Sequence, residues 1–220
     1  MESFISIDIL FRWLHVLFGV TWIGLLYYFN FIQGEYFKEA EAGAKADATQ
    51  KLAPRALWWF RWGAMFTFIT GLILLVGIRK TWGIDGYITM GALMGTFMFL
   101  NVWLIIWPNQ KIVCGIVEGD ASVAGPKALL ASRTNTLFSA PMALGMIASS
   151  HGGGAAGNII DHASLPSMGM GTGVMIVLGL IVLLEANAIF GKMGPMATVK
   201  GVIHCSLGLT VAFLALMQFV

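Results

Sequence analysis

Charged residues are scarce in this sequence. They make up 11% of the 220 residues, whereas an ordinary soluble domain has about 25%. Hydrophobic residues make up 58%, so most of the surface is not suited to water. This composition excludes an ordinary soluble domain and favours a bundle of helices that contacts membrane lipid. No patch of basic residues indicates a nucleic-acid partner.

Cysteine is equally scarce. The two cysteines, Cys114 and Cys205, lie far apart and have apolar neighbours, so nothing indicates a disulfide framework or a zinc site. The sequence has no internal repeat, so nothing indicates an inverted-repeat transporter. The opening MESFISIDIL has neither a basic stretch nor a small-residue cleavage pattern, so we expect the first apolar run to stay as a span.

Apolar stretches recur along the whole chain. Crossing the hydrocarbon core takes roughly 20 apolar residues in a helix, and every backbone polar group must be satisfied inside the segment. The stretches that meet this requirement are 7–32, 57–78, 86–107, 134–150, 168–190 and 198–219. The fourth is the shortest and contains Pro141. We therefore predict an all-α fold, a polytopic transmembrane helical bundle of about six spans that forms one domain over residues 1–220.

Lysine and arginine lie mainly in alternate connections. One group comprises Lys38, Lys45, Lys51, Arg55, Arg61, Lys111, Lys127, Arg133, Lys192 and Lys200. The opposite side has only Arg12, Arg79 and Lys80. By the positive-inside rule, the polar connection 33–56, a loop or short helix, faces the cytoplasm and both termini face the periplasmic side.

Two histidines are expected at a similar height toward the outer face. His15 lies in the first span and His151 at the end of the fourth. Neutral histidines from two helices of a bundle suit the axial positions of haem b, so both are candidate ligands of the haem iron. Alternatively, His15 binds a backbone carbonyl and His151 caps a helix end. His162 could replace His151, and Met90 and Met94 are weaker candidates.

A second polar level is expected near the cytoplasmic face. It comprises Asn30, Arg61, Asn101, Asn109, Arg133, Asn135, Glu185, Asn187 and His204. Glu185 and His204 are the candidate catalytic pair for moving a proton or holding a ligand nitrogen, and the alternative is a bond that only joins two helices. Arg61 and Arg133 could bind a planar anion through paired hydrogen bonds, or extend to the lipid headgroups. The asparagines of this level are further substrate-binding candidates.

Three ordered motifs resemble one known family. RWLHVLFGVTWIGLLYYFNF in the first span, NVWLIIWPNQ and SRTNTLFSAPM are similar to the membrane domain of bacterial cytochrome-linked urate hydroxylases, the urate oxidase N-terminal family. The resemblance implies a place for His15, Trp22, Asn30, Asn101, Trp107, Asn109, Arg133, Asn135 and Pro141 in the family pattern. It also makes Trp22 a cofactor-binding candidate. The opening pattern is similar, too, to small membrane haem proteins of the protoporphyrinogen oxidase type.

The resemblance implies a function in redox chemistry at the bacterial inner membrane. The family joins its membrane domain to a cytochrome c domain, but this sequence has no Cys-x-x-Cys-His. We therefore expect a membrane haem protein without that domain, either oxidising urate or a similar molecule or relaying electrons to a separate cytochrome c or quinone. The alternatives are a cofactor-free permease that uses Glu185 and His204, and a structural or assembly subunit of a respiratory complex.

Overall fold

The first helix runs well past its predicted end. The computed structural model describes residues 6–81, 84–151, 158–160 and 171–220. Helix α1 (Ile7–Tyr27) begins at Ser6, whose hydroxyl accepts a hydrogen bond from the Ile9 amide at 3.3 Å. The helix continues as a π-helical segment, η1 (Tyr28–Gln33), and then as α2 (Gly34–Glu39). The predicted span 7–32 is thus the apolar part of a longer helix.

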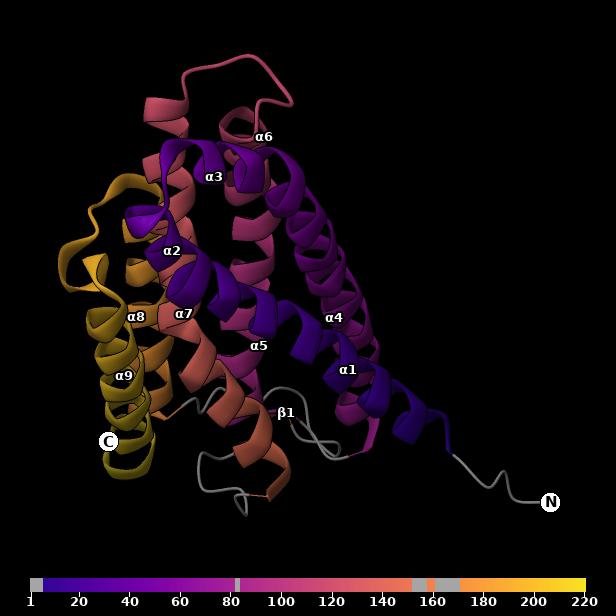
Figure 1. Cartoon of the computed structure of the whole chain (residues 1–220). Helices are drawn as coiled ribbons and strands as arrows, with labels where there is room; N and C mark the ends of the chain where they lie inside the picture. The colour runs from indigo at the N-terminus through magenta and orange to yellow at the C-terminus, as the bar shows by residue number, and fades with distance from the viewer. Residues whose placement is uncertain (1–5, 82–83, 152–157, 161–170) are drawn as a thin grey trace.

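The connection 33–56 is almost entirely helical. After a break at Ala40–Glu41 come α3 (Ala42–Asp47), η2 (Ala48–Leu52) and α4 (Ala53–Thr81). Alanine, glutamate and lysine have high helix propensities, so this polar stretch has no reason to leave the helical conformation. It lies at the end of the molecule that carries α3 (Figure 1).

The third and fourth helical regions meet in the centre of the bundle. Helix α5 (Gly86–Leu100) passes through a second π-helical segment, η3 (Asn101–Ile106), into α6 (Trp107–Val113). Helix α7 (Ala121–His151) follows, and its 31 residues extend about 46 Å. Two short strands, β1 (Ile84–Asp85) and β2 (Asn158–Ile160), pair antiparallel.

Helix α7 is the hub of the fold. It contacts α1, α5, α6, α8 (Thr172–Phe190) and α9 (Val199–Phe219), and it also touches the short 3-10 turn η4 (Gly194–Ala197). Gly145 permits its closest approach, because a Cβ atom there would lie 2.7 Å from the Tyr87 carbonyl oxygen of α5. A helix enclosed in this way faces other helices more than lipid.

Within the described residues, five helices are long and apolar enough to cross a membrane: Ile7–Glu39, Ala42–Ile78, Gly86–Val113, Thr172–Phe190 and Val199–Phe219. Helix α7 is not among them, although it is long enough. Its polar residues Thr134, Asn135, Thr136 and Ser139 are buried against neighbouring helices, which lowers its hydropathy without exposing them to lipid. The helical, membrane-protein class is confirmed, while the count of six spans and the sides of the termini stay predictions.

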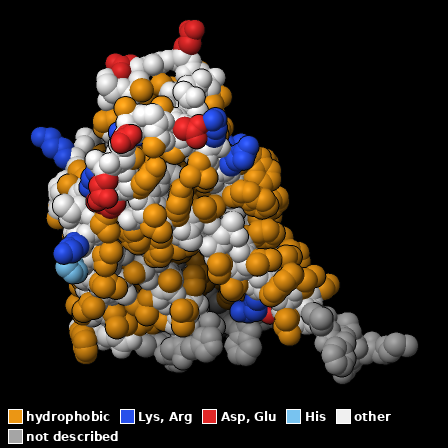
Figure 2. All heavy atoms as spheres, viewed as in Figure 1, with side chains coloured by type: hydrophobic (Ala, Val, Ile, Leu, Met, Phe, Trp, Pro, Cys, Tyr) orange, Lys and Arg blue, Asp and Glu red, His pale blue; other side chains and the backbone are white. Residues whose placement is uncertain are grey.

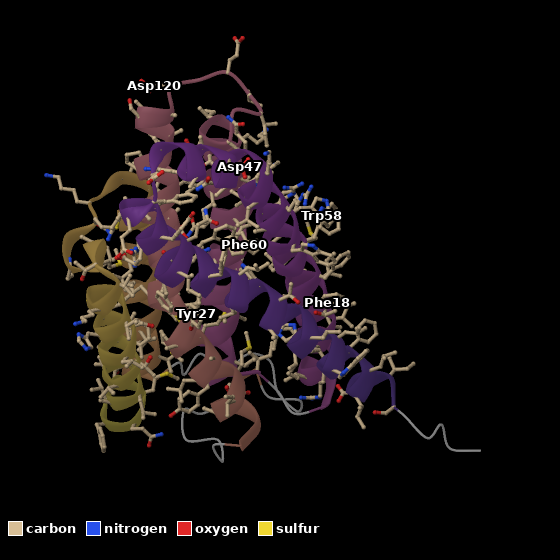
Figure 3. The ribbon with its side chains drawn as sticks, viewed as in Figure 1. Phe18, Tyr27, Asp47, Trp58, Phe60 and Asp120 are labelled. Carbon is tan, nitrogen blue, oxygen red and sulfur yellow. The ribbon has the colours of Figure 1, made fainter. Side chains whose placement is uncertain are left out.

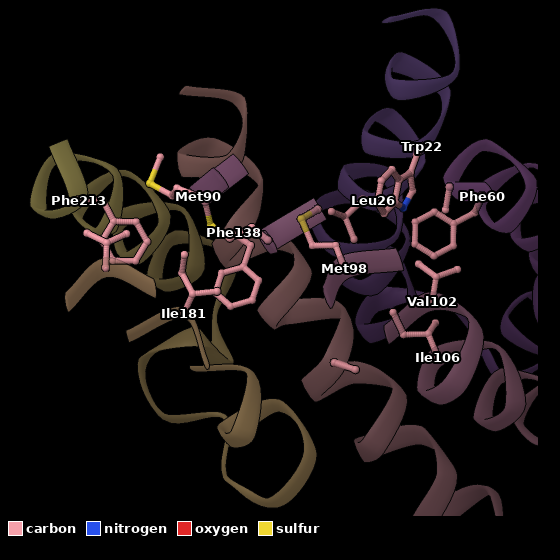
Figure 4. Close-up of a cluster of buried hydrophobic side chains, with 14 of the residues drawn as sticks. Trp22, Leu26, Phe60, Met90, Met98, Val102, Ile106, Phe138, Ile181 and Phe213 are labelled. Atoms are coloured by element: carbon pink, nitrogen blue, oxygen red, sulfur yellow. The ribbon is translucent and has the colours of Figure 1, made fainter. Parts of the chain in front are cut away.

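The surface and the core fit a membrane bundle. Figure 2 shows hydrophobic side chains over the middle of the viewed face and most charged side chains toward the α3 end. Large apolar residues such as Val20, Leu183 and Val211 lie on the outer surface, each 67% exposed, as lipid contact requires. Inside, Trp22 and Phe60 join α1 to α4, and Phe138 lies among the residues of α7, α8 and α9 (Figure 4).

Candidate functional site

Residues of the first and third motifs meet where η1 crosses α7. The Asn30 amide nitrogen donates to the Leu26 carbonyl at 2.9 Å and to the Ser132 hydroxyl at 2.8 Å. Its Oδ1 atom is buried and has no hydrogen-bond partner among the described residues. Three residues later, at the end of η1, Gln33 Oε1 is also buried and has no partner among the described residues. Both atoms are acceptors that lack a donor.

A second contact between the same helices lies one turn away. The Tyr27 hydroxyl, labelled in Figure 3, is 2.8 Å from Ser139 Oγ, which itself donates to the Thr136 carbonyl. These bonds fix the end of α1 against α7. They therefore also hold the position of Asn30.

Residues of the second and third motifs meet on a different face of α7. Asn101 begins η3 and donates to Asn135 Oδ1 at 2.9 Å and to Glu185 Oε2 of α8 at 3.1 Å. Asn135 in turn donates to the Met98 carbonyl at 2.9 Å. All three polar side chains are buried. The structure thus brings three of the inner-level candidates into one hydrogen-bonded chain.

Arg133 is the most unusual buried group. The residue is 4% exposed, yet its Nε and Nη1 atoms have no hydrogen-bond partner among the described residues. Glu35 of α2 is within electrostatic range, but its carboxylate forms an ion pair with Lys38 at 2.8 Å. A buried guanidinium without an acceptor is strongly unfavourable, which makes this position a candidate anion site.

Arg133 and Asn135 do not face the same space. Successive residues of an α-helix are rotated by about 100°, so residues two positions apart differ by about 200° around the axis. The side chains of Arg133 and Asn135 therefore leave α7 on nearly opposite sides. Leu137, one turn after Arg133, packs with Met196 and Val202 of the η4 and α9 region. The predicted inner level therefore divides into at least two sites around α7.

Arg61 occupies a third position. Its Cζ lies 3.8 Å from the centre of the Trp107 ring, a cation–π contact between α4 and α6. Its neighbour Trp62 packs edge-on against Trp103 at 5.7 Å. Arg61 Nη1 and Trp103 Nε1 are buried donors without a partner in the described part of the chain.

Two predicted substrate-binding asparagines make local bonds instead. Asn109 donates to the Ile105 carbonyl at 2.7 Å within its own helix. Asn187 closes the end of α8, because its side chain donates to the Lys192 carbonyl and accepts from the Lys192 amide. The structure does not bring either residue to the buried polar chain.

The predicted pair of Glu185 and His204 is not formed. Glu185 points to Asn101, whereas His204 lies exposed on α9. No hydrogen bond or ion pair joins them in the described residues. The height of both residues followed from residue counts, but the counts do not give the side of the helix that each one faces.

His15 has a defined ring orientation. Its Nδ1 atom lies 2.9 Å from the Thr67 carbonyl and 3.1 Å from Thr70 Oγ1, both on α4. A carbonyl oxygen can only accept, so Nδ1 carries the hydrogen and Nε2 keeps its lone pair. Gly71 leaves room for the ring, since a Cβ atom there would lie 3.0 Å from His15 Cε1.

This arrangement fits one axial ligand of a haem. Metal-binding histidines usually donate their second ring nitrogen to a carbonyl or carboxylate, which fixes the tautomer in the same way. Phe18, labelled in Figure 3, packs on Phe66 at 5.0 Å and supports the same α1–α4 contact. The contact with the Thr67 carbonyl is also the backbone bond that the sequence offered as the alternative role of His15.

The side chain of His151, the second proposed haem ligand, lies outside the described residues. His151 is the last residue of α7, but its side chain and all of His162 lie outside the described residues. Figure 1 shows the N-terminal half of α1 leaving α7 and running beside α4, with which α1 makes its main contact. Met90 and Met94 are completely buried in the core.

Trp22 has an unexpected feature for a core residue. It is buried beside Leu26 and Phe60 in Figure 4, and Gly63 of α4 lies close to its backbone. Its Nε1 atom has no partner among the described residues. It therefore packs the α1–α4 contact and also offers one free donor there.

Sequence reasoning missed Ser132, Gln33 and Trp103. Ser132 precedes Arg133 in the third motif, so its position beside two polar candidates was the available signal. For Gln33 and Trp103 the sequence has no pattern that would show whether their polar atoms are buried or exposed. Their burial depends on how η1 and η3 are rotated.

The fold and its interior define a class: a helical membrane protein whose buried polar groups come from three separate motifs. Residues 78–178 match the family model described as urate oxidase N-terminal, and this match covers just under half of the 220-residue chain. The predicted family is thereby confirmed for this region, which contains Asn101, Arg133 and Asn135. No curated protein and no solved structure was found to match the chain.

Proposed function

We propose that this chain is a membrane redox protein that binds urate or a similar planar anion and passes its electrons to a haem. The family match and the membrane class support this proposal. The observation that carries it is the unpartnered guanidinium of Arg133, deep in the fold and within the matched region. The planar guanidinium of arginine presents paired N–H donors along its edges, which suits a bidentate anion.

Acceptors on the helical segment that contacts α7 would complete a site for such a molecule. Ser132, its neighbour in the chain, binds Asn30, and Glu35 of the following helix is within electrostatic range of Arg133. The oxygens of Asn30 and Gln33 that lack a donor among the described residues both belong to η1, which contacts α7. Urate carries ring N–H donors beside its anionic edge. The two oxygens would accept from those donors while Arg133 binds the anion.

His15, which is expected toward the outer face, is the proposed axial ligand of the haem. Its Nε2 atom would bind the iron, while Thr67 and Thr70 hold the ring and its tautomer. A bound haem supplies a centre that accepts electrons one at a time. His151 stays the proposed second ligand. Electrons would leave to a separate cytochrome c or to quinone.

A reduced optical spectrum of the purified protein tests the haem. We expect Soret and alpha bands after dithionite, and their loss in His15→Ala. The matched control is Thr21→Ala, which removes an exposed hydroxyl from the same helix and should leave the bands unchanged. A protein without iron, or a His15→Ala variant with full haem occupancy, would reject this part of the proposal.

A cofactor-free permease is the second candidate, because the same unpartnered groups would also serve a passing substrate. Uptake of urate into proteoliposomes made with iron-free protein distinguishes the two. Uptake that is lost in Arg133→Met would favour the permease. Absence of uptake, together with haem bands, favours the redox protein.

A further inference from the structure

Glu185 is a buried carboxyl group with very little around it to stabilise a negative charge. The residue is 7% exposed, and among the described residues its one hydrogen-bond partner is the Asn101 amide nitrogen, at 3.1 Å. No ion pair in the described part of the chain includes it. A carboxylate held in this way would be close to an unpaired buried charge, which proteins avoid.

Asp85 shows what a stabilised buried carboxylate looks like in the same fold. One of its oxygens accepts from the Ile88 amide and the other from the Ser149 hydroxyl, each at 2.8 Å. It also stands at the N-terminus of α5, where a negative charge is favoured. Glu185 has none of this support.

The direction of the hydrogen-bonded chain beside Glu185 is fixed by the backbone. The Met98 carbonyl can only accept, so the Asn135 amide nitrogen must face it. Asn135 Oδ1 then faces Asn101, which must present its own amide nitrogen in return. That nitrogen is also the donor to Glu185.

This direction leaves one atom without a partner. Asn101 Oδ1 is buried in a residue that is 1% exposed, and no described group donates to it. An unmade hydrogen bond at a buried carbonyl is unfavourable. The atom belongs to the same amide group whose nitrogen contacts Glu185, so the carboxyl group is the natural source of a donor.

We propose that the Glu185 carboxyl group is protonated in the folded protein and that its O–H donates a hydrogen bond to Asn101 Oδ1. A carboxylic acid and a primary amide then form a paired ring, in which the amide N–H donates to the acid C=O and the acid O–H donates to the amide C=O. A single proton removes the buried charge and satisfies the orphaned oxygen. Glu185 is thus a proton-binding site on the face of α7 opposite Arg133.

The other ionisable groups on the elements around α8 do not change this reasoning. Helix α8 packs against α5, α7 and α9. These helices carry Tyr87, Lys127, Arg133, His151, Lys200, His204 and Cys205. Tyr87 binds Gln218, Arg133 leaves α7 on nearly the opposite side from Asn135, and Lys127 and His204 are exposed. No described group supplies a cation to Glu185.

Infrared spectroscopy of the full-length protein at neutral pH tests the proposal directly. The wild-type protein should show the C=O stretch of a protonated carboxyl group, and this band should vanish in Glu185→Gln. The exposed control Glu118→Gln and the buried control Asp85→Asn should retain it. Absence of the band in the wild type, or its persistence in Glu185→Gln, would overturn the proposal.

A second variant separates the paired ring from a proton held in another way. Asn101→Leu removes both partners of the acid, so the protonated-carboxyl band should stay but move to the higher frequency of a less hydrogen-bonded acid. Glu185→Gln should also keep the wild-type melting temperature, since a glutamine can form the same paired ring with Asn101. An unshifted band in Asn101→Leu would contradict the assigned partner. These readouts need neither haem nor urate, so they are independent of the proposed function.

Discussion

Replacing Arg133 by methionine should have opposite effects on stability and on binding. Arg133 is 4% exposed and two of its nitrogen atoms lack acceptors, so the ligand-free protein bears the cost of a buried, uncompensated charge. Replacing a buried ion pair by apolar groups of similar size is often neutral or stabilising, by about 1–4 kcal/mol, and Arg133 has no ion-pair partner among the described residues that its replacement would leave uncompensated. We expect the free energy of unfolding of Arg133→Met without ligand to equal or exceed that of the wild type.

Binding should weaken in the same variant. Two hydrogen bonds to a charged partner contribute about 1.5–3 kcal/mol each, so their loss costs about 3–6 kcal/mol. This loss corresponds to roughly a hundredfold to ten-thousandfold increase in Kd. Calorimetric titration with urate, and thermal unfolding with and without urate, would measure both quantities on one detergent-solubilised sample.

The control for this experiment is Lys127→Met. Lys127 lies on the same helix and is exposed, so its replacement should change neither the urate affinity nor the melting temperature by much. An Arg133→Met protein that is clearly destabilised and binds urate as the wild type does would refute the reasoning. That result would mean that Arg133 is satisfied within the protein and has no role in binding.

Three further predictions concern packing, hydrogen bonding and thiol reactivity. Gly145→Val should lower the free energy of unfolding by about 1–3 kcal/mol, because a Cβ atom at this position would lie 2.7 Å from the Tyr87 carbonyl oxygen. Thermal unfolding measures this effect, and the control is Gly24→Ala, where a Cβ atom would meet open space. Asn30→Leu should cost about 1–3 kcal/mol in the same assay, since the Leu26 carbonyl and Ser132 lose their donor, and an unchanged melting temperature would contradict it. Burial raises the pKa of the Cys114 thiol, so the reactive thiolate should form only at higher pH than in the unfolded chain. Maleimide labelling of a Cys205→Ala protein, followed across pH in the folded and the urea-unfolded chain, measures this; equal rates near neutral pH would contradict it.

The sequence predicts the helices better than their ends. Apolar runs mark the parts of α1, α4, α5, α8 and α9 that are suited to lipid, because contact with hydrocarbon constrains composition directly. The beginning of α7 at Ala121 carries no such mark. Its early turns lie before the apolar stretch 134–150, and enclosure by other helices allows it polar residues that hydropathy counts against a span.

The candidate site shows the same division between depth and direction. Counting residues placed Asn101, Asn135 and Glu185 at similar depth, and the structure joins them. The same counting grouped Arg133 with Asn135, although their side chains leave α7 on nearly opposite sides. The π-helical segments η1, which contains Asn30, and η3, which begins at Asn101, change the rotation of the helix at these residues, and the sequence carries no periodic signal for them.

Anaerobic addition of urate to the oxidised, purified protein tests the central claim most directly. The proposed function predicts that haem bands of the reduced form appear in the wild type with urate alone, and that Arg133→Met shows them only with dithionite. Haem that dithionite reduces but saturating urate leaves oxidised in the wild type would contradict urate oxidation by this chain.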